Sequence, residues 1–247
     1  MVSWNCFVAS SFVGLFVFGC GDWANSKVEN TNQVVQESNV TELLIKVKAT
    51  QKADDFLNQG NQLLDSQRYE EAIAAYDKAI AIKAESPEAW INRGNALNSL
   101  QSYKDALLSY DKAIAIKKDL HEAWYNRGNV LTSLQSYNDA LISYDKAIAI
   151  KPDKYEAWVN RGIALTKMQR YQDALKSYNQ AIAIKPDKHQ AYYNKACSYA
   201  LQNNVKLTVK NLQKAIWLSP EKYQKLAKTD PDFNKVRSDK RFQELLQ

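Results

Sequence analysis

The side chains best suited to acid–base chemistry in this chain are two histidines, His121 and His189. They stand at the same position of a repeating pattern, in the loop expected before a helix. The sequence contains no phosphate-binding loop, no Cys-x-x-Cys, no H-E-x-x-H and no G-x-S-x-G motif. We interpret both histidines as surface residues, with a functional pair as the alternative. The sequence therefore predicts no catalytic residue, no metal ligand, no cofactor and no enzymatic activity.

The cysteines are Cys6, Cys20 and Cys197, too few for a disulfide framework. Residues 7–19 form an uncharged stretch rich in Phe and Val that is too short to span a bilayer and is typical of a secretory signal. Residues 17–20, VFGC, resemble the lipobox of bacterial lipoproteins. That resemblance implies a signal peptide at 1–19, lipidation of Cys20 and a membrane anchor on the extracytoplasmic side. The alternative is an unprocessed, cytoplasmic chain. Cys197 is expected to be a small packed residue.

Charge and composition narrow the class of protein further. The 33 Lys and Arg residues exceed the 27 Asp and Glu residues by six, and the two signs alternate, as in Asp111-Lys112. This pattern indicates a mixed, solvated surface and predicts no nucleic-acid partner. With only seven Gly and five Pro in 247 residues, the chain has few turn-forming residues, which favours helices over strands.

One octapeptide recurs at a fixed spacing. YDKAIAIK occupies residues 76–83, 110–117 and 144–151, and YNQAIAIK follows at 178–185, each copy 34 residues after the last. Counted from Ala53, the period defines five units: 53–86, 87–120, 121–154, 155–188 and 189–222. A constant period of this length predicts a stacked array of similar units.

Each unit contains two amphipathic patterns. The first half has an aromatic residue, a small residue four later and an apolar residue three after that, as in Trp124, Gly128 and Leu131. The second half repeats Ala and Tyr on one face, as in Ala140 and Tyr144. A helix-interior Gly costs about 1 kcal/mol relative to Ala, so its recurrence at 94, 128 and 162 predicts close helix contacts.

Short turns separate the two patterns. Ser102 and Ser136 are expected to cap the second helices, with an acidic residue three positions later. Lys-Pro-Asp at 151–153 and 185–187 is expected to end them. Each unit is thus predicted to be a helical hairpin that buries its apolar surface only with a neighbour on each side.

The full signature, W-x-x-R-G-x-x-L, then Y-x-x-A-x-x-x-Y-x-x-A, then P, closely resembles the tetratricopeptide repeat family. The segments NRGNAL (92–97) and YDKAIAIKPD (144–153) resemble cyanobacterial members in particular. The resemblance implies an all-α fold, a right-handed superhelical solenoid of helix-turn-helix hairpins. The end units depart from the signature, with Phe56 or Tyr192 in place of Trp and Ala196 in place of Gly, which suits capping units.

The resemblance also implies a concave groove, lined by the first helices, that binds peptide or protein partners. Asn amides suit an extended peptide because they donate and accept at once. Glu88, Glu122 and Glu156 disfavour an acidic C-terminal tail as the ligand. The alternative is that the Asn residues are ordinary solvated surface. The expected binding residues are Asn92, Asn95, Tyr125, Asn126, Asn129, Val159, Asn160, Tyr193 and Asn194.

A recurring arginine precedes the Gly in three units, at positions 93, 127 and 161. We interpret these residues as a structural ladder with acids at a similar height on the paired helix of the hairpin, Asp111 and Asp145, and a role in the groove is the alternative.

Together these inferences give a domain plan: a signal peptide at 1–19, a polar tether at 20–52 with a helix beginning at Thr41, five repeats at 53–222 and a capping segment at 223–247. The expected function is a non-enzymatic, membrane-tethered scaffold for protein or peptide partners. The alternative is a soluble cytoplasmic assembly factor or chaperone-like adaptor of the same fold.

Overall fold

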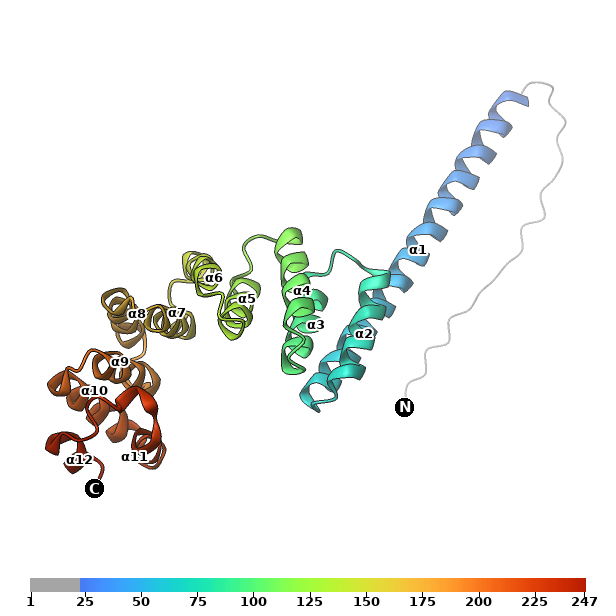
Figure 1. Cartoon of the computed structure of the whole chain (residues 1–247). Helices are drawn as coiled ribbons and strands as arrows, with labels where there is room; N and C mark the ends of the chain where they lie inside the picture. The colour runs from blue at the N-terminus through green and yellow to red at the C-terminus, as the bar shows by residue number, and fades with distance from the viewer. Residues whose placement is uncertain (1–22) are drawn as a thin grey trace, which may run out of the picture. The chain divides into compact units, whose positions relative to one another are not determined.

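The computed structural model describes the backbone of residues 23–247 and the side chains of residue 36 and residues 38–247. The expected signal peptide and Cys20 therefore lie outside the described residues. All regular elements from residue 23 onward are helical (Figure 1). The chain divides into two units, residues 1–49 and residues 50–247.

The first helix, α1, spans Trp23–Asp65. It begins well before Thr41, the expected start of the helix. The physical reason is that residues 23–65 contain no Pro and only one Gly, Gly60, so no residue interrupts the intrahelical hydrogen bonds. The role of residues 20–52 as a tether stays a prediction.

The second unit is a succession of antiparallel helix pairs of constant length. The last part of α1 is the first helix of the first hairpin. In every hairpin the second helix has 14 residues. The first helices after α1 have 13 residues each: α3 (Pro87–Ser99), α5 (His121–Ser133), α7 (Tyr155–Lys167) and α9 (His189–Leu201). The second helices are α2 (Tyr69–Ile82), α4 (Tyr103–Ile116), α6 (Tyr137–Ile150), α8 (Tyr171–Ile184) and α10 (Val205–Leu218).

The turn inside each hairpin has a residue with left-handed backbone geometry. In the second hairpin this residue is Gln101, with φ of 60°, and the Ser102 N–H donates to the Leu97 carbonyl at 2.9 Å. This backbone bond closes the end of α3 in the manner of a Schellman motif. The same position is taken in the five turns by Gln67, Gln101, Gln135, Gln169 and Asn203.

The expectation that serine side chains cap the second helices is correct for their position but wrong for their hydrogen bonds. Ser102 and Ser136 do occupy the N-cap positions of α4 and α6, but neither side chain makes a capping hydrogen bond. Their ψ angles are 62°, because the tight left-handed turn brings the chain into the helix from a direction other than the extended one that a capping side chain needs.

Glycine and tyrosine determine how closely the two helices of a hairpin approach. A Cβ added at Gly128 would lie 2.6 Å from Cε1 of Tyr144, whose side chain is fully buried. Gly60, Gly94 and Gly162 face Tyr76, Tyr110 and Tyr178 in the same way. The predicted close contact at the Gly positions is confirmed.

The C-terminal segment covers the end of the fifth hairpin with α11 (Pro220–Thr229), a 3-10 turn η1 (Pro231–Phe233) and α12 (Lys240–Leu245). Phe233 and Phe242 are buried, with ring centroids 5.3 Å apart, in one apolar cluster with Leu212 and Tyr223. These aromatic residues bury the apolar surface that a further hairpin would otherwise cover.

Candidate functional site

A ladder of asparagine side chains joins the first helices of consecutive hairpins. Asn126 Nδ2 on α5 donates to Asn95 Oδ1 on α3 at 2.9 Å. The next rung runs from Asn160 Nδ2 on α7 to Asn129 Oδ1 on α5, at 2.8 Å. The preceding rung runs from Asn92 Nδ2 to Asn61 Oδ1, at 2.9 Å. The ladder repeats because two positions of every first helix share one face, three residues apart.

A buried tyrosine holds the accepting asparagine of each rung. The Tyr110 hydroxyl donates to Asn95 Oδ1 at 2.9 Å, so this oxygen accepts two hydrogen bonds. Tyr76 and Tyr144 bond Asn61 and Asn129 in the same way. Burial raises the pKa of Tyr110 well above its usual value, so its hydroxyl stays a donor at neutral pH.

Polar side chains surround a hollow of about 340 Å³ beside the rung that Asn95 and Asn126 form. Asn98 and Ser99 extend the face of α3, and Glu122 contributes a carboxylate from the first turn of α5. Asn98 and Glu122 have no hydrogen-bond or ion-pair partner among the described side chains. The hollow is lined by Asn95, Asn98, Ser99, Tyr110, Glu122, Asn126 and Asn129.

Six of the nine expected binding residues lie in or beside this ladder: Asn92, Asn95, Tyr125, Asn126, Asn129 and Asn160. The Tyr125 hydroxyl accepts a second hydrogen bond from Asn160 Nδ2, at 3.1 Å. These asparagines are not merely solvated surface, because each makes a hydrogen bond to an asparagine of a neighbouring hairpin. Asn61, Asn98 and Ser99 were missed, although a spacing of 34 residues from Asn95 would have pointed to Asn61.

Two expected binding residues are buried and cannot line a groove. Val159 is only 3% exposed because it packs with Tyr155 and Ala191 between two first helices. Tyr193 is 6% exposed because the C-terminal segment covers it: its ring stacks on Tyr223 with centroids 4.5 Å apart.

Asn194, on α9, is half-buried and has no ladder partner among the described residues. Ile163 stands 34 residues after Asn129, where an accepting asparagine would be needed. The ladder therefore ends at Asn160.

The recurring arginines form a structural ladder, as expected, but the expected partner is wrong: each pairs with the Asp on the second helix of the preceding hairpin. Stacking places that helix beside the arginine, and the second helix of its own hairpin supplies a buried serine instead. Arg127 Nε donates to Asp111 Oδ1 at 2.8 Å, and its Nη1 donates to the buried Ser143 hydroxyl at 2.8 Å. Its guanidinium lies 6.0 Å from the Trp124 ring centroid. Arg93 and Arg161 have equivalent partners. Each arginine joins two successive second helices, so its role is structural.

Comparison with protein families assigns these repeats. A TPR repeat model matches residues 60–100 and 94–135, and a Tetratricopeptide repeat model matches residues 121–154 and 155–188. Together the matches span residues 60–188, more than half of the chain. The chain is a tetratricopeptide repeat protein. The fifth hairpin, α9 and α10, lies outside these matches, in keeping with Ala196 and Leu212 where other repeats have Gly and Tyr.

Solved tetratricopeptide structures share the fold. The crystal structure of YrrB, described as a TPR protein with an unusual peptide-binding site, is 26% identical over 73% of this chain and 92% of its own, with a TM-score of 0.60. MamA is 23% identical over 72% of this chain and 96% of its own, with a TM-score of 0.62. MamA from Desulfovibrio magneticus RS-1 is 20% identical over 69% of this chain and 96% of its own, with a TM-score of 0.65. Comparison with curated proteins gave no match. The predicted all-α, right-handed superhelical solenoid is confirmed.

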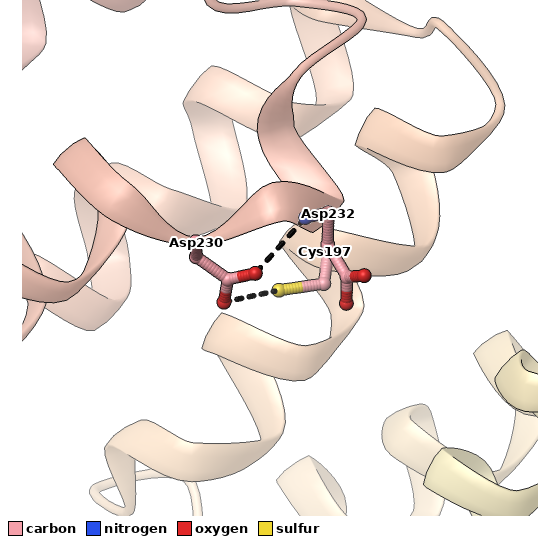
Figure 2. A group of neighbouring side chains, drawn as sticks. All are labelled: Cys197, Asp230 and Asp232. Atoms are coloured by element: carbon pink, nitrogen blue, oxygen red, sulfur yellow. Dashed lines mark hydrogen bonds between the residues drawn. The ribbon is translucent and has the colours of Figure 1, made fainter.

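One cluster of potential metal ligands lies where the C-terminal segment meets the last tetratricopeptide repeat. Asp230 Oδ2 accepts from the Tyr193 hydroxyl at 2.6 Å. The same oxygen lies 4.0 Å from Cys197 Sγ, and Asp230 Oδ1 accepts from the Asp232 N–H at 3.0 Å (Figure 2). Burial, with the two carboxylates, raises the pKa of the Cys197 thiol, so the sulfur stays protonated. These side chains are thus hydrogen-bonded to one another, and the contacts fit attachment of the C-terminal segment to α9 better than a metal site.

The two histidines are the first residues of α5 and α9, half-buried rather than in an exposed loop. His189 Nδ1 lies 2.6 Å from the Tyr223 hydroxyl, whereas His121 Nδ1 is buried without a partner among the described residues. Burial lowers the pKa of both imidazoles, and nearby lysines lower it further. Neither histidine lies with a nucleophile in a described cavity.

From residue 23 onward, the helices that the structure describes include none that is long and apolar enough to cross a membrane.

Proposed function

We propose that this tetratricopeptide repeat protein is a non-enzymatic scaffold that binds an extended peptide segment of a partner protein along the asparagine ladder. The observation that supports this most directly is the pattern of hydrogen-bonding groups that the ladder leaves free. YrrB, a similar tetratricopeptide protein, is described as having a peptide-binding site, which adds support.

The two asparagines of a rung leave different groups free. Asn95 Oδ1 already accepts from Tyr110 and Asn126, so the amide NH₂ group of Asn95 remains available as a donor. Asn126 donates one N–H and keeps its oxygen available as an acceptor. Donors and acceptors therefore alternate along the ladder, as they do along the backbone of an extended peptide.

The acidic residues near the ladder favour particular side chains in the ligand. Glu122 borders the polar hollow, and Glu88 and Glu156 take the same position at the start of α3 and α7. Glu156 is ion-paired with Lys154 and Lys185. The carboxylates of Glu88 and Glu122, unpaired among the described residues, attract a basic side chain and repel an acidic one. A neutral or basic peptide is therefore the expected ligand, in preference to an acidic tail.

The experiment is a selection of peptides from a random displayed library on the immobilised chain, followed by affinity measurements with variants. Asn98→Ala combined with Glu122→Gln should lower the affinity for the selected peptides at least several-fold, since each lost hydrogen bond contributes about 0.5–1.5 kcal/mol. This pair is a sharper test than Ala at Asn92, Asn126 and Asn160, because those residues also hold neighbouring hairpins together.

Lys146→Ala, an exposed charge on α6, is the matched control and should leave the affinity unchanged. If no peptide is selected, or if the selected peptides bind the Asn98 and Glu122 variant as tightly as the wild type, the ladder is not the binding surface.

We further propose that Cys20 is lipidated and tethers the repeats to a membrane on the extracytoplasmic side. The support is the sequence before Cys20 and the need for two acyl chains in stable anchoring, which diacylation supplies. Cys20→Ser should abolish incorporation of labelled fatty acid and release the protein from membranes. Cys6→Ser should still incorporate the label and remain bound to membranes. A wild-type chain that takes up no label and fractionates as soluble contradicts the tether.

A further inference from the structure

The net positive charge of the chain lies in its C-terminal part. Residues 189–247 contain eleven Lys or Arg and five Asp or Glu, whereas residues 1–188 contain 22 of each kind. Helix α10 has three lysines, Lys206, Lys210 and Lys214, which follow one face at intervals of four residues, and it has no acidic residue. None of the three lysines has an ion-pair partner among the described residues. These lysines define a basic face of α10.

Helix α10 lacks the carboxylates that other second helices have at two repeat positions. Leu207 takes the place of an acidic residue present in α2, α4, α6 and α8, and Gln213 takes the place of an aspartate present in α2, α4 and α6. Helix α4 also has lysines at two of the α10 positions, Lys104 and Lys112, but an aspartate adjoins each of them in the sequence. The lysines of α10 therefore differ from those of α4 in having no acidic neighbour on their helix. The acidic residues concerned are Glu71, Asp105, Asp139 and Asp173 at the first position and Asp77, Asp111 and Asp145 at the second.

The ladder of arginine and aspartate also loses its carboxylate at the fifth hairpin. Lys195 on α9 takes the repeat position of Arg127, and its Nζ donates to Asn179 Oδ1 at 2.6 Å. Asn179 takes the position of Asp111, and its amide accepts the hydrogen bond but has no charge to balance the ammonium. Burial and the nearby Lys210 lower the pKa of Lys195, which indicates that positive charges are crowded here. An anion bound at α10 would reduce this repulsion.

An aromatic hollow adjoins the basic face. Its volume is about 460 Å³, and it is lined by Tyr192, Lys210, Asn211, Gln213, Lys214 and Trp217. Trp217 is 70% exposed, and the ammonium of Lys214 lies 3.8 Å from its ring centroid. The other second helices have Ala at the position of Trp217, so the tryptophan is specific to α10. An exposed tryptophan beside a hollow is typical of an interface anchor.

We propose that the basic face of α10 binds an acidic peptide segment of a partner protein. Carboxylates of the segment pair with Lys206 and Lys210, and a large apolar or aromatic side chain beside them enters the hollow against Trp217. The segment thus supplies the negative charge that the fifth hairpin lacks. This site lies on a second helix and selects acidic ligands, whereas the asparagine ladder lies on first helices and favours neutral or basic ones. The two binding proposals are therefore independent.

The dimensions and chemistry of the basic face favour a peptide over a nucleic acid. Lys206 and Lys214 are eight residues apart, so the face is about 12 Å long, which matches about four residues of extended peptide. Single-stranded nucleic acids bind over about four nucleotides or more, which need a longer basic track, and stack their bases on exposed rings. The ammonium of Lys214 already covers one face of the Trp217 ring and closes it to stacking. Carboxylates, in contrast, are the groups that other repeats place beside their lysines.

The experiment is a selection from a random displayed peptide library on the immobilised full chain, after depletion of the library on the α10 variant Lys206→Glu with Lys210→Glu. The recovered peptides should combine Asp or Glu with an aromatic or large aliphatic residue. Synthetic copies should bind the α10 variant and Trp217→Ala at least several-fold more weakly than the wild type, and salt at about 0.5 M should weaken binding because it screens the charges. The matched control is Lys104→Glu with Lys112→Glu on α4, the same change of charge, which should leave the affinity unchanged.

Circular dichroism establishes that each variant keeps the helical content of the wild type, and Lys206→Gln with Lys210→Gln replaces the charge reversal if it does not. Peptides that bind the asparagine ladder should be neutral or basic and should also bind the α10 variant, so the two sites fail separately. The proposal is overturned if the depleted library yields no acidic peptide, or if the α4 control weakens binding as much as the α10 variant. It is equally overturned if the basic face retains a single-stranded oligonucleotide, anionic vesicles or a second copy of the chain in place of acidic peptides.

Discussion

Asn126 donates a 2.9 Å hydrogen bond to Asn95, which lies one hairpin earlier in the chain. Asn95 is in turn fixed by the hydroxyl of Tyr110, from the second helix of its own hairpin. One amide oxygen therefore connects three helices: α3, α4 and α5. The residues expected to hold a ligand also hold the solenoid together, so binding and stability are coupled at this position.

Asn95→Ala is expected to destabilise the fold more than Asn126→Ala. Loss of Asn95 leaves the buried Tyr110 hydroxyl without its acceptor, which costs about 1–3 kcal/mol, whereas loss of Asn126 removes one bond worth about 0.5–1.5 kcal/mol. Urea unfolding of the three proteins measures the difference. Asn194→Ala is the control and should be neutral. Equal losses for Asn95 and Asn126 would contradict the double role of the Asn95 oxygen.

Gly128→Leu should force α5 away from α6. Its Cβ would lie 2.6 Å from the Tyr144 ring, so overpacking should cost about 1–3 kcal/mol or more in thermal unfolding. The fifth hairpin suggests a compensating change, because it has Ala196 and Leu212 at these two positions. Gly128→Ala should therefore be less costly in a Tyr144→Leu background than in the wild type. Strictly additive effects would mean that the two residues do not meet.

Gln135→Gly should stabilise the third hairpin. Gln135 has φ of 60°, where a side chain is unfavourable by about 1–2 kcal/mol, and glycine avoids that strain at the cost of a larger unfolded-state entropy. A net gain of about 0.5–1 kcal/mol is expected from chemical denaturation. The same substitution at Gln172, inside α8, is the control and should destabilise by up to about 1 kcal/mol. A loss at Gln135 would contradict the strain argument.

Protonation of the histidines should destabilise the fold at mildly acidic pH. Burial lowers the pKa of His121 and His189 in the folded state below the unfolded value of about 6.5, so the unfolded state binds more protons near pH 6. The stability that this difference contributes is complete above about pH 7 and is lost as pH falls from about 6.5 through the lower folded-state pKa values.

The melting temperature of the wild type should therefore decrease between pH 7.5 and 5.5, a range chosen to lie above most carboxylate titrations. The double variant His121→Gln and His189→Gln should show a flatter dependence. A variant with the slope of the wild type would mean that other groups determine the pH response.

The sequence by itself determined the repeat and the hairpin. The 34-residue period, the Gly positions and the turn spacing are local patterns, and each hairpin uses them in the same way because the same short-range packing recurs. The close approach of Gly128 to Tyr144, within one hairpin, follows from this register. The Arg127–Asp111 pair does not, because it joins two hairpins. The extent of α1 was not predicted, since a polar composition alone does not prevent helix formation.

Only the tertiary structure decided which of the expected groove positions are buried and which partners they contact. Val159 and Tyr125 hold the same repeat position, yet Val159 is buried and Tyr125 is half-buried, because neighbouring first helices differ in the side chains they supply. Tyr193 is covered by the C-terminal segment that begins at Pro220, whose Tyr223 stacks on its ring. The asparagine partners also lie in separate hairpins. A periodic sequence specifies local geometry, but burial and pairing depend on which surfaces stacking brings together, and this is a property of the assembled array.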